Sequence, residues 1–173
     1  MSDHLKRITA PRSWNVGRKS HFWATKPAPG PHSLEGSVPL VMVLRDYLQV
    51  CDNAREARRV LADGKVQVDQ HVVRDPKRSV GLMDVVSLPA AKSNFRCLLD
   101  HRGRLHFSEI KATEAKWKLL RVEGKTTVRG GKTQLNLHDG SNLLSEEAVA
   151  TGDVLQVALP GRKIKKVLKF DKG

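Results

Sequence analysis

Cysteine is scarce in this sequence of 173 residues, and long apolar runs are missing. The two cysteines, Cys51 and Cys97, form no Cys-x-x-Cys pair, so a disulfide framework or a zinc knuckle is not expected, and a reducing cytosolic compartment fits. The longest apolar run, "LVMVL" at residues 40–44, is far shorter than the roughly 20 residues that span a bilayer. The N-terminal stretch "MSDHLKRITAPRSW" lacks the apolar core of a secretory signal. We therefore expect neither membrane insertion nor secretion.

Acidic residues are also in short supply. Asp and Glu number 18 against 31 Lys and Arg, which gives a formal charge of +13. An excess of this size attracts polyanions, meaning nucleic acid or an anionic membrane surface. The excess is +4 in residues 1–39, +2 in residues 40–94 and +7 in residues 95–173. The length allows one domain of ordinary size or two small ones.

A complete nucleotide-binding P-loop is missing as well. The triplet Gly-Lys-Thr, which ends a P-loop, occurs twice in "VEGKTTVRGGKTQLNLHDG" at residues 122–140. A P-loop also needs a glycine five positions before its Gly-Lys pair, because the loop must bend tightly around phosphate. Leu119 stands there before Gly124, and Thr126 stands there before Gly131. Nucleoside triphosphate binding is therefore not expected.

Catalytic and metal-binding patterns are not found either. His101 and His106 are interpreted as surface or turn residues, and Asp139 after His138 fits a strand that enters an Asp-Gly turn. No Ser-His-Asp set can be assembled without choosing residues arbitrarily. None of the seven histidines has metal-ligand spacing: His4, His21, His32, His71, His101, His106 and His138. We expect no enzymatic activity, no metal and no cofactor.

The first 39 residues predict a basic, extended arm. They contain five prolines and show no sustained helix or strand periodicity, which is typical of disordered tails. Trp14, Phe22 and Trp23 favour the alternative, since disordered tails are usually poor in aromatic residues. An arm that orders against RNA, or against its own domain, can use these rings, for example by stacking on bases.

Residues 40–94 predict a small α+β module of two helices and an antiparallel sheet. We expect a short helix over 40–48 and a second helix over 54–62, capped by Asp52 or Asn53 and ended by Gly64. Valine-rich strands separated by turn residues follow. The expected core positions are Leu44, Tyr47, Leu48, Leu61 and Val66.

One face of the second predicted helix is cationic. At 100° per residue, Arg55, Arg58 and Arg59 lie opposite the apolar sector of the helix. We name these three residues the arginine face. A solvated helix surface is the ordinary interpretation of such charges, but Lys65 and Lys77 nearby favour phosphate contact, for which the planar fork of arginine is suited.

Residues 95–173 predict a central β domain, as a small barrel or sandwich. The stretch "FRCLLDHRGRLHFSEI" has the signature of a hairpin, and further short strand-like runs follow with glycine-containing turns. We expect Gly124 and the pair Gly130-Gly131 to form such turns, because glycine adopts positive φ at little cost. Cations at or beside the turn tips are then available to RNA phosphates.

The stretch "REARRVLADGKVQVDQHVVRDP" resembles the S4 RNA-binding domain. It departs from the usual pattern at Asp69-Gln70, where Asn-Gly is common, and at Gly81–Asp84, where two residues separate a usual Gly-Asp pair. The flanking motifs "HLKR", "APRSW", "PAPGPH" and "GKTTVRGGKTQLNLHDGSNLL" are similar to the ribosomal protein S4e family of archaeal and eukaryotic small subunits, over nearly the whole chain. The module pattern is carried by Arg55, Ala57, Arg58, Gly64, Val66, Val68 and Pro76.

The resemblance implies a structural constituent of the cytoplasmic ribosome that binds small-subunit rRNA, contacts neighbouring ribosomal proteins and catalyses nothing. Family members normally continue past "KFDKG" into a KOW-type barrel, so we expect this chain to lack that region. Two alternatives use the same module: an RNA-modifying enzyme such as a pseudouridine synthase, and a factor that binds stalled ribosomes. Only 79 residues follow residue 94, without a cluster of functional acids, which disfavours the enzyme.

Basic residues in all three regions are the predicted RNA contacts, through phosphate and shape more than through base edges. They are Lys6, Arg7, Arg12, Arg18, Lys19, Arg55, Arg58, Arg59, Lys65, Lys77, Arg78, Lys125, Arg129 and Lys132.

Overall fold

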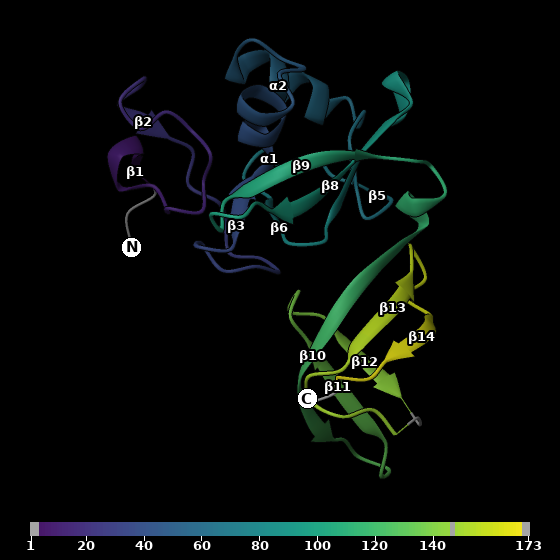
Figure 1. The fold of residues 1–173 in the computed structure, drawn as a ribbon. Helices are drawn as coiled ribbons and strands as arrows, with labels where there is room; N and C mark the ends of the chain where they lie inside the picture. Colours follow the sequence, from purple (N-terminus) through teal and green to yellow (C-terminus); the bar gives the residue numbers. More distant parts are fainter. Residues whose placement is uncertain (1–3, 146–147, 171–173) are drawn as a thin grey trace.

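The computed structural model describes residues 4–145 and 148–170, which form two lobes (Figure 1). The upper lobe contains the arm, the helices and one five-stranded antiparallel sheet. The lower lobe contains a second five-stranded antiparallel sheet, and strand β10 leads into it from the upper lobe. The architecture is therefore a mixed α and β fold dominated by antiparallel sheets.

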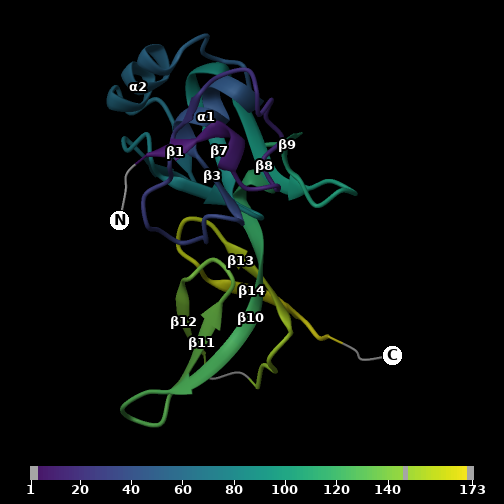
Figure 2. The same ribbon diagram turned by 90° about the vertical axis from the view of Figure 1, so that its left-hand side faces the viewer.

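The arm lies against the upper lobe (Figure 2). Its short strand β1 (Leu5–Lys6) pairs with β2 (Trp23–Ala24), and a 3₁₀ turn covers Arg7–Thr9. Trp14 anchors the segment between these strands: its side chain is 2% exposed, and its Nε1 donates a hydrogen bond of 2.6 Å to the carbonyl oxygen of Ser37. The arm thus orders against its own domain, the alternative that its aromatic residues favoured.

The first predicted helix begins where expected and then widens. After β3 (Ser37–Pro39), an α-helical turn, α1, covers Leu40–Met42, and a π-helical segment covers Val43–Tyr47. The amide of Leu48 bonds to the carbonyl oxygen of Val43 at 2.9 Å, the i to i+5 contact of a π turn. A helix is therefore present over the predicted residues, but most of it is wound as a π-helix instead of an α-helix.

The second helix, α2, covers Ala54–Ala62 as predicted. The side chain of Asn53 caps it by accepting a hydrogen bond of 2.9 Å from the amide of Glu56, and Gly64 follows with φ at +70°. Among the predicted core residues, Leu44, Leu61 and Val66 are fully buried, and Tyr47 and Leu48 pack against them.

The upper sheet has the strand order β5-β4-β7-β8-β9. The hairpin predicted from residue 95 onward is present as β8 and β9, but β8 also pairs with β7 along its edge. Strand β8 therefore runs through the predicted division at 94/95 and places the hairpin in the sheet of the module. The strands are β4 (Gln67–Val68), β5 (His71–Val72), β7 (Val85–Leu88), β8 (Ser93–Leu99) and β9 (Leu105–Ile110), while β6 (Ser79–Gly81) pairs with β3.

The lower sheet is a half-barrel built on β10 (Trp117–Thr127), with the order β12-β11-β10-β13-β14. The first part of β10, residues 117–121, pairs with β13, and its second part, from Val122, pairs with β11. Among the described residues, β12 and β14 are the two edges of this sheet, so the predicted small barrel or sandwich is an open half-barrel. The remaining strands are β11 (Thr133–Leu137), β12 (Asn142–Ser145), β13 (Val154–Ala158) and β14 (Ile164–Leu168).

The two glycine sites of the β region differ. Gly130 and Gly131 have φ of 92° and 74° and form the turn between β10 and β11, as predicted. Gly124 instead lies within β10, where the register with β11 shifts between Val122 and Gly124. The expectation of a turn at Gly124 was wrong, because a bulge accommodates the glycine inside the strand.

Candidate nucleic-acid interface

The arginine face of α2 is exposed along its length. Ala57 and Leu61 point into the core with no exposed surface, and Arg55, Arg58 and Arg59 lie on the opposite side. Within the described residues, these three guanidinium groups make no hydrogen bond or ion pair. The charge of Arg59 also acts on Asp63, but none of the three guanidinium groups is held in a close ion pair, so they are available to a ligand.

Arg7 departs from the predicted set of RNA contacts. Its residue is 3% exposed, its Nε donates a hydrogen bond of 2.7 Å to the carbonyl oxygen of Gly17, and a terminal nitrogen lies 3.4 Å from Asp46. The guanidinium group thus holds the arm to the π-helical segment. The prediction that Arg7 faces RNA did not anticipate this burial, and we leave Arg7 out of the proposed surface.

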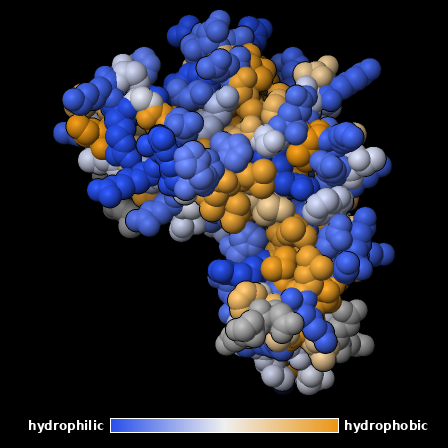
Figure 3. Space-filling model, viewed as in Figure 1, coloured by the Kyte–Doolittle hydropathy of each residue, from blue (hydrophilic) through white to orange (hydrophobic). Residues whose placement is uncertain are grey.

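The other predicted cations are exposed, apart from the half-buried Arg18. Lys65 forms an ion pair of 2.9 Å with Asp63, so its charge is shared. Lys125 lies on β10 instead of at a turn tip, whereas Arg129 and Lys132 lie in and just after the turn that follows. On the face drawn in Figure 3, hydrophilic and hydrophobic surface are mixed over the arm.

Cavities around the arm bring several of these cations together. One cavity of about 350 Å³ is lined by Lys6, Arg18 and Lys19 beside Phe22. A second, of about 680 Å³, is lined by Arg12 and Arg18 together with Arg102 and Arg104 of the β8–β9 turn, two residues that the prediction missed. A third, of about 310 Å³, joins Trp23 of the arm to Arg58 of the arginine face.

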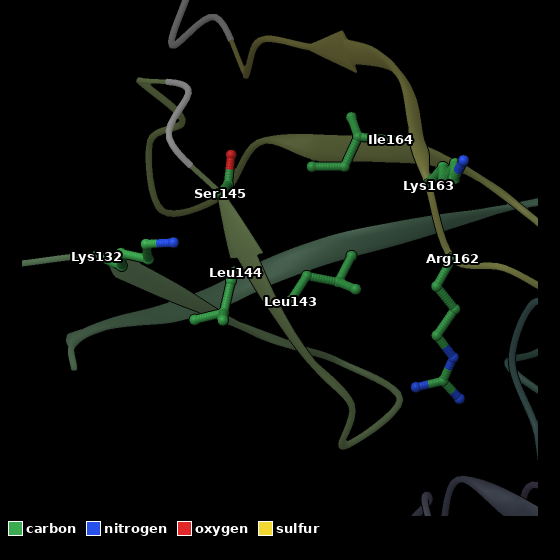
Figure 4. Close-up of a pocket in the computed structure, with 7 residues that line it drawn as sticks. All are labelled: Lys132, Leu143, Leu144, Ser145, Arg162, Lys163 and Ile164. Carbon is green, nitrogen blue, oxygen red and sulfur yellow. The ribbon is translucent and has the colours of Figure 1, made fainter. Parts of the chain in front are cut away.

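A fourth cavity, of about 610 Å³, lies between the edge strands of the half-barrel. Figure 4 shows side chains of β12 and β14 around this space, with Lys132 at one side and Arg162 at the other. Leu143, Leu144 and Ile164 give it an apolar lining. Lys132 is the one predicted contact here, because the basic loop before β14 was not considered as a site.

A buried charge cluster joins the two lobes. The Nζ of Lys118 lies 2.6 Å from Asp69, 3.2 Å from Asp84 and 2.9 Å from Asp139, and the side chain of Lys118 is 1% exposed. Asp84 also hydrogen-bonds with Nε2 of His32 at 2.8 Å. We name Lys118 and the three aspartates the junction cluster.

The pKa values in the junction cluster follow from burial and proximity. Burial acts to lower the pKa of Lys118, but the three carboxylates outweigh it and raise that pKa above its usual value. Burial and repulsion from Asp84 raise the pKa of Asp69. Burial also acts to raise the pKa of Asp84, but the hydrogen bond from His32 and the charge of Lys118 hold it below its usual value.

The sequence contained one signal for the junction cluster. Lys118 alternates with Leu120 and Val122 along β10, so its side chain points to the same buried face of the strand. A charged side chain on a buried face needs a partner of opposite charge. The partners lie in separate segments, so the phase alone does not name them.

Within residues 4–145 and 148–170, no group of three or more His, Cys, Asp or Glu side chains is placed to hold a metal ion. Cys51 and Cys97 are both buried free thiols. In the same described ranges, no helix is long and apolar enough to cross a bilayer.

Three family models match successive parts of the chain. The model of the RS4NT (NUC023) domain matches residues 1–35, that of the S4 domain matches residues 38–86, and that of ribosomal family S4e matches residues 91–164. The second match covers α1, α2 and the first strands of the module, including the arginine face. The class is therefore that of S4-domain proteins of the ribosomal kind.

Comparisons with individual proteins agree. Small ribosomal subunit protein eS4 of Methanosphaera stadtmanae is 45% identical over 170 residues, covering 98% of this chain and 70% of the relative, and eS4 of Methanothermobacter thermautotrophicus is 45% identical over 169 residues with the same coverage. The crystal structure of 30S ribosomal protein S4e from Thermoplasma acidophilum superposes with a TM-score of 0.69 at 37% identity, covering 80% of this chain and 71% of that chain. The chain belongs to the eS4 family of small ribosomal subunit proteins.

Proposed function

We propose that the chain is a structural constituent of the small ribosomal subunit, where it binds ribosomal RNA and supports assembly and translation. The observation that carries the proposal is 45% identity to archaeal eS4 proteins across 98% of the chain. The relatives named above are ribosomal proteins, and none supports the alternatives of an RNA-modifying enzyme or a stalled-ribosome factor. The proposed role is non-catalytic, and the proposed location is the cytoplasmic ribosome.

The arginine face, Lys77 and Arg78 form the proposed main RNA surface on the module, supported by Lys6, Arg12, Arg18 and Lys19 on the arm. Exposed arginines without ion-pair partners bind phosphate oxygens in pairs and release counterions, which gives affinity without base readout. Double-stranded RNA suits this mode because its deep, narrow major groove hides the base edges. Arg129 and Lys132 form a second proposed contact on the half-barrel, with Lys125 and Lys65 at the margins.

We also propose three structural units, in which the boundary between the second and third differs from the predicted division at 94/95. The arm covers residues 1–39, the module extends through β9, and the half-barrel begins at β10. Pairing of β7 with β8 supports a module that extends past residue 94, because strands that share a ladder fold together. The junction cluster then fixes the module and the half-barrel against each other, with both lobes positioned to contact rRNA and neighbouring ribosomal proteins.

Sedimentation tests the proposal directly. The tagged chain, expressed in an archaeal host, should travel with small subunits in a sucrose gradient, and ultraviolet crosslinking should join it to small-subunit rRNA. A variant with all three arginine-face residues changed to alanine should crosslink less. A chain that stays at the top of the gradient, or that crosslinks only to other RNA classes, would overturn the proposal.

A further inference from the structure

The cavity of about 310 Å³ beside Trp23 combines an exposed aromatic ring with cations from four separate segments, including Lys26 of the arm. Trp23 comes from β2, Arg45 from the π-helical segment, Arg58 from the arginine face and Lys77 from the loop before β6. We name this cavity the Trp23 cleft. Segments far apart in the sequence thus build one site on the surface of the upper lobe.

The exposure of Trp23 is not required by the packing of the arm. Trp23 is 54% exposed, whereas Trp14 of the same arm is 2% exposed and supplies the anchor. The backbone pairing of Trp23 with Lys6 needs no particular side chain. An exposed indole that contributes little to the core is free to contact a ligand.

Neighbouring rings hold Trp23 in place. The ring centroids of Phe22 and Trp23 are 4.7 Å apart at 82°, an edge-to-face contact, and the His4 ring lies 5.6 Å from Trp23. A side chain that is already ordered loses less entropy when a ligand stacks on it. Trp23 is therefore a preorganised stacking surface.

The cations of the cleft are arranged for an anion. Arg58 has no hydrogen bond or ion pair among the described residues. Arg45 pairs with Asp46 at 2.8 Å, and Arg7 pairs with the same carboxylate at 3.4 Å. One negative charge is thus shared between two guanidinium groups and cannot neutralise both. The site keeps a net positive charge beside the indole ring.

We propose that the Trp23 cleft binds one unpaired nucleotide of an RNA strand, with the base stacked on Trp23 and the phosphate bound by Arg58 and Arg45. This inference rests on the proposed RNA-binding function and adds a single-stranded subsite to it. Aromatic stacking beside a basic groove is how proteins bind single-stranded nucleic acid. An acidic peptide would pair with the arginines but would bring no aromatic ring to stack on the indole face.

Fluorescence titration of the full chain with a short single-stranded RNA tests the proposal. Stacking quenches indole emission, and Trp14 is buried while Trp117 lies under the guanidinium group of Arg96 at 4.4 Å, so Trp23 should give most of the signal. Trp23→Leu should abolish the quenching and weaken binding by roughly 5- to 140-fold. Trp23→Tyr should keep much of the affinity, because it keeps a ring.

Matched controls separate stacking from a general loss of charge or shape. Val72→Ala removes an exposed apolar side chain on the edge strand β5 and should leave the affinity unchanged, with equal melting temperatures for all variants. Arg58→Ala should lower the slope of log K against log salt by about 0.7, the value for one phosphate contact on a single strand. A fully paired RNA duplex should bind Trp23→Leu and the parent chain equally.

Two results would overturn the proposal while the ribosomal function stands. In the first, the chain co-sediments with small subunits but Trp23→Leu binds single-stranded RNA as tightly as the parent chain. In the second, a poly-glutamate peptide quenches Trp23 at least as strongly as RNA does. The second result would assign the cleft to a protein partner. A parent chain that neither binds RNA nor co-sediments would instead overturn the proposed function itself.

Discussion

The Nζ of Lys118 on β10 lies 2.6 Å from a carboxylate oxygen of Asp69 in the module, and this ion pair joins the two lobes. Asp84 of the module and Asp139 after β11 share the same ammonium group, so one cation serves both sides of the junction. Charges this deeply buried are costly to leave unpaired, because water cannot replace the missing partner. Lys118 is therefore a central contact between the half-barrel and the module, beside the hydrogen bond of 2.7 Å that Arg96 of β8 donates to the carbonyl oxygen of Trp117.

Lys118→Met should destabilise the chain by about 3 to 5 kcal/mol, because it leaves three buried carboxylates without their shared partner. Urea unfolding monitored by circular dichroism measures this loss. Lys116→Met, two residues earlier and exposed, is the control and should change the free energy of unfolding by no more than about 0.5 kcal/mol. Equal stability of the Lys118→Met chain and the parent would contradict the assignment.

Asp139 should make stability depend on acid pH. Burial acts to raise its pKa, but the charge of Lys118 and hydrogen bonds from Ser141 and Lys118 outweigh it and lower the pKa of Asp139 to about 2. The unfolded value is about 3.9. A carboxyl group whose pKa is lower in the folded state stabilises the fold fully above the unfolded pKa, and this contribution is lost as pH falls through the folded pKa.

The stability difference between the parent and Asp139→Asn isolates this contribution. It should be constant near neutral pH and should shrink between about pH 4 and about pH 2, the window set by the two pKa values. Denaturant unfolding at a series of pH values measures it. A difference that stays the same down to pH 2 would mean that Asp139 is not held as a carboxylate by Lys118.

Trp14 should be the residue through which the arm stabilises the upper lobe. Trp14→Phe removes the hydrogen bond of 2.6 Å to the carbonyl oxygen of Ser37 and leaves part of a buried space empty, at a cost of about 1 to 3 kcal/mol. Thermal unfolding measures the change. Trp23→Phe, at the exposed ring of the same arm, should shift stability by no more than about 0.5 kcal/mol; similar losses for both would place the anchor elsewhere.

The arginine face should govern the salt dependence of RNA binding. Replacing Arg55, Arg58 and Arg59 with alanine should weaken binding and flatten the slope of log K against log salt by roughly two, because each phosphate that is no longer neutralised lowers the slope by about 0.7 to 0.9. Filter binding at several salt concentrations measures the slope.

The control for the arginine face removes the same charge elsewhere. Alanine at Lys92, Lys111 and Lys116, all exposed, lowers the net charge equally and should change the slope less. An equal change for the two triple variants would show that the net charge matters and the position does not.

Local chemistry made part of the fold predictable. The bounds of α2, its Asn53 cap and the left-handed Gly64 all follow from contacts within a few residues, and the structure confirms each of them. The π-helical winding after Met42 was not predictable in this way, because its residues have no distinct local signature. Gly124 was misplaced for the opposite reason: glycine suits a turn and a bulge equally well, and pairing with β11 selects the bulge.

At the interface, the positive charge, the cationic side of α2 and the family of the chain could all be inferred from the amino-acid sequence, since composition, helical phase and motifs are properties of the linear chain. Three other features became visible only in the folded chain: Arg7 is buried, Trp23 meets Arg58 in one cleft, and Lys118 joins two lobes. Burial and ion pairing depend on distances between segments that are far apart in sequence. Such distances are set by the packing of the whole chain, which local propensity does not specify.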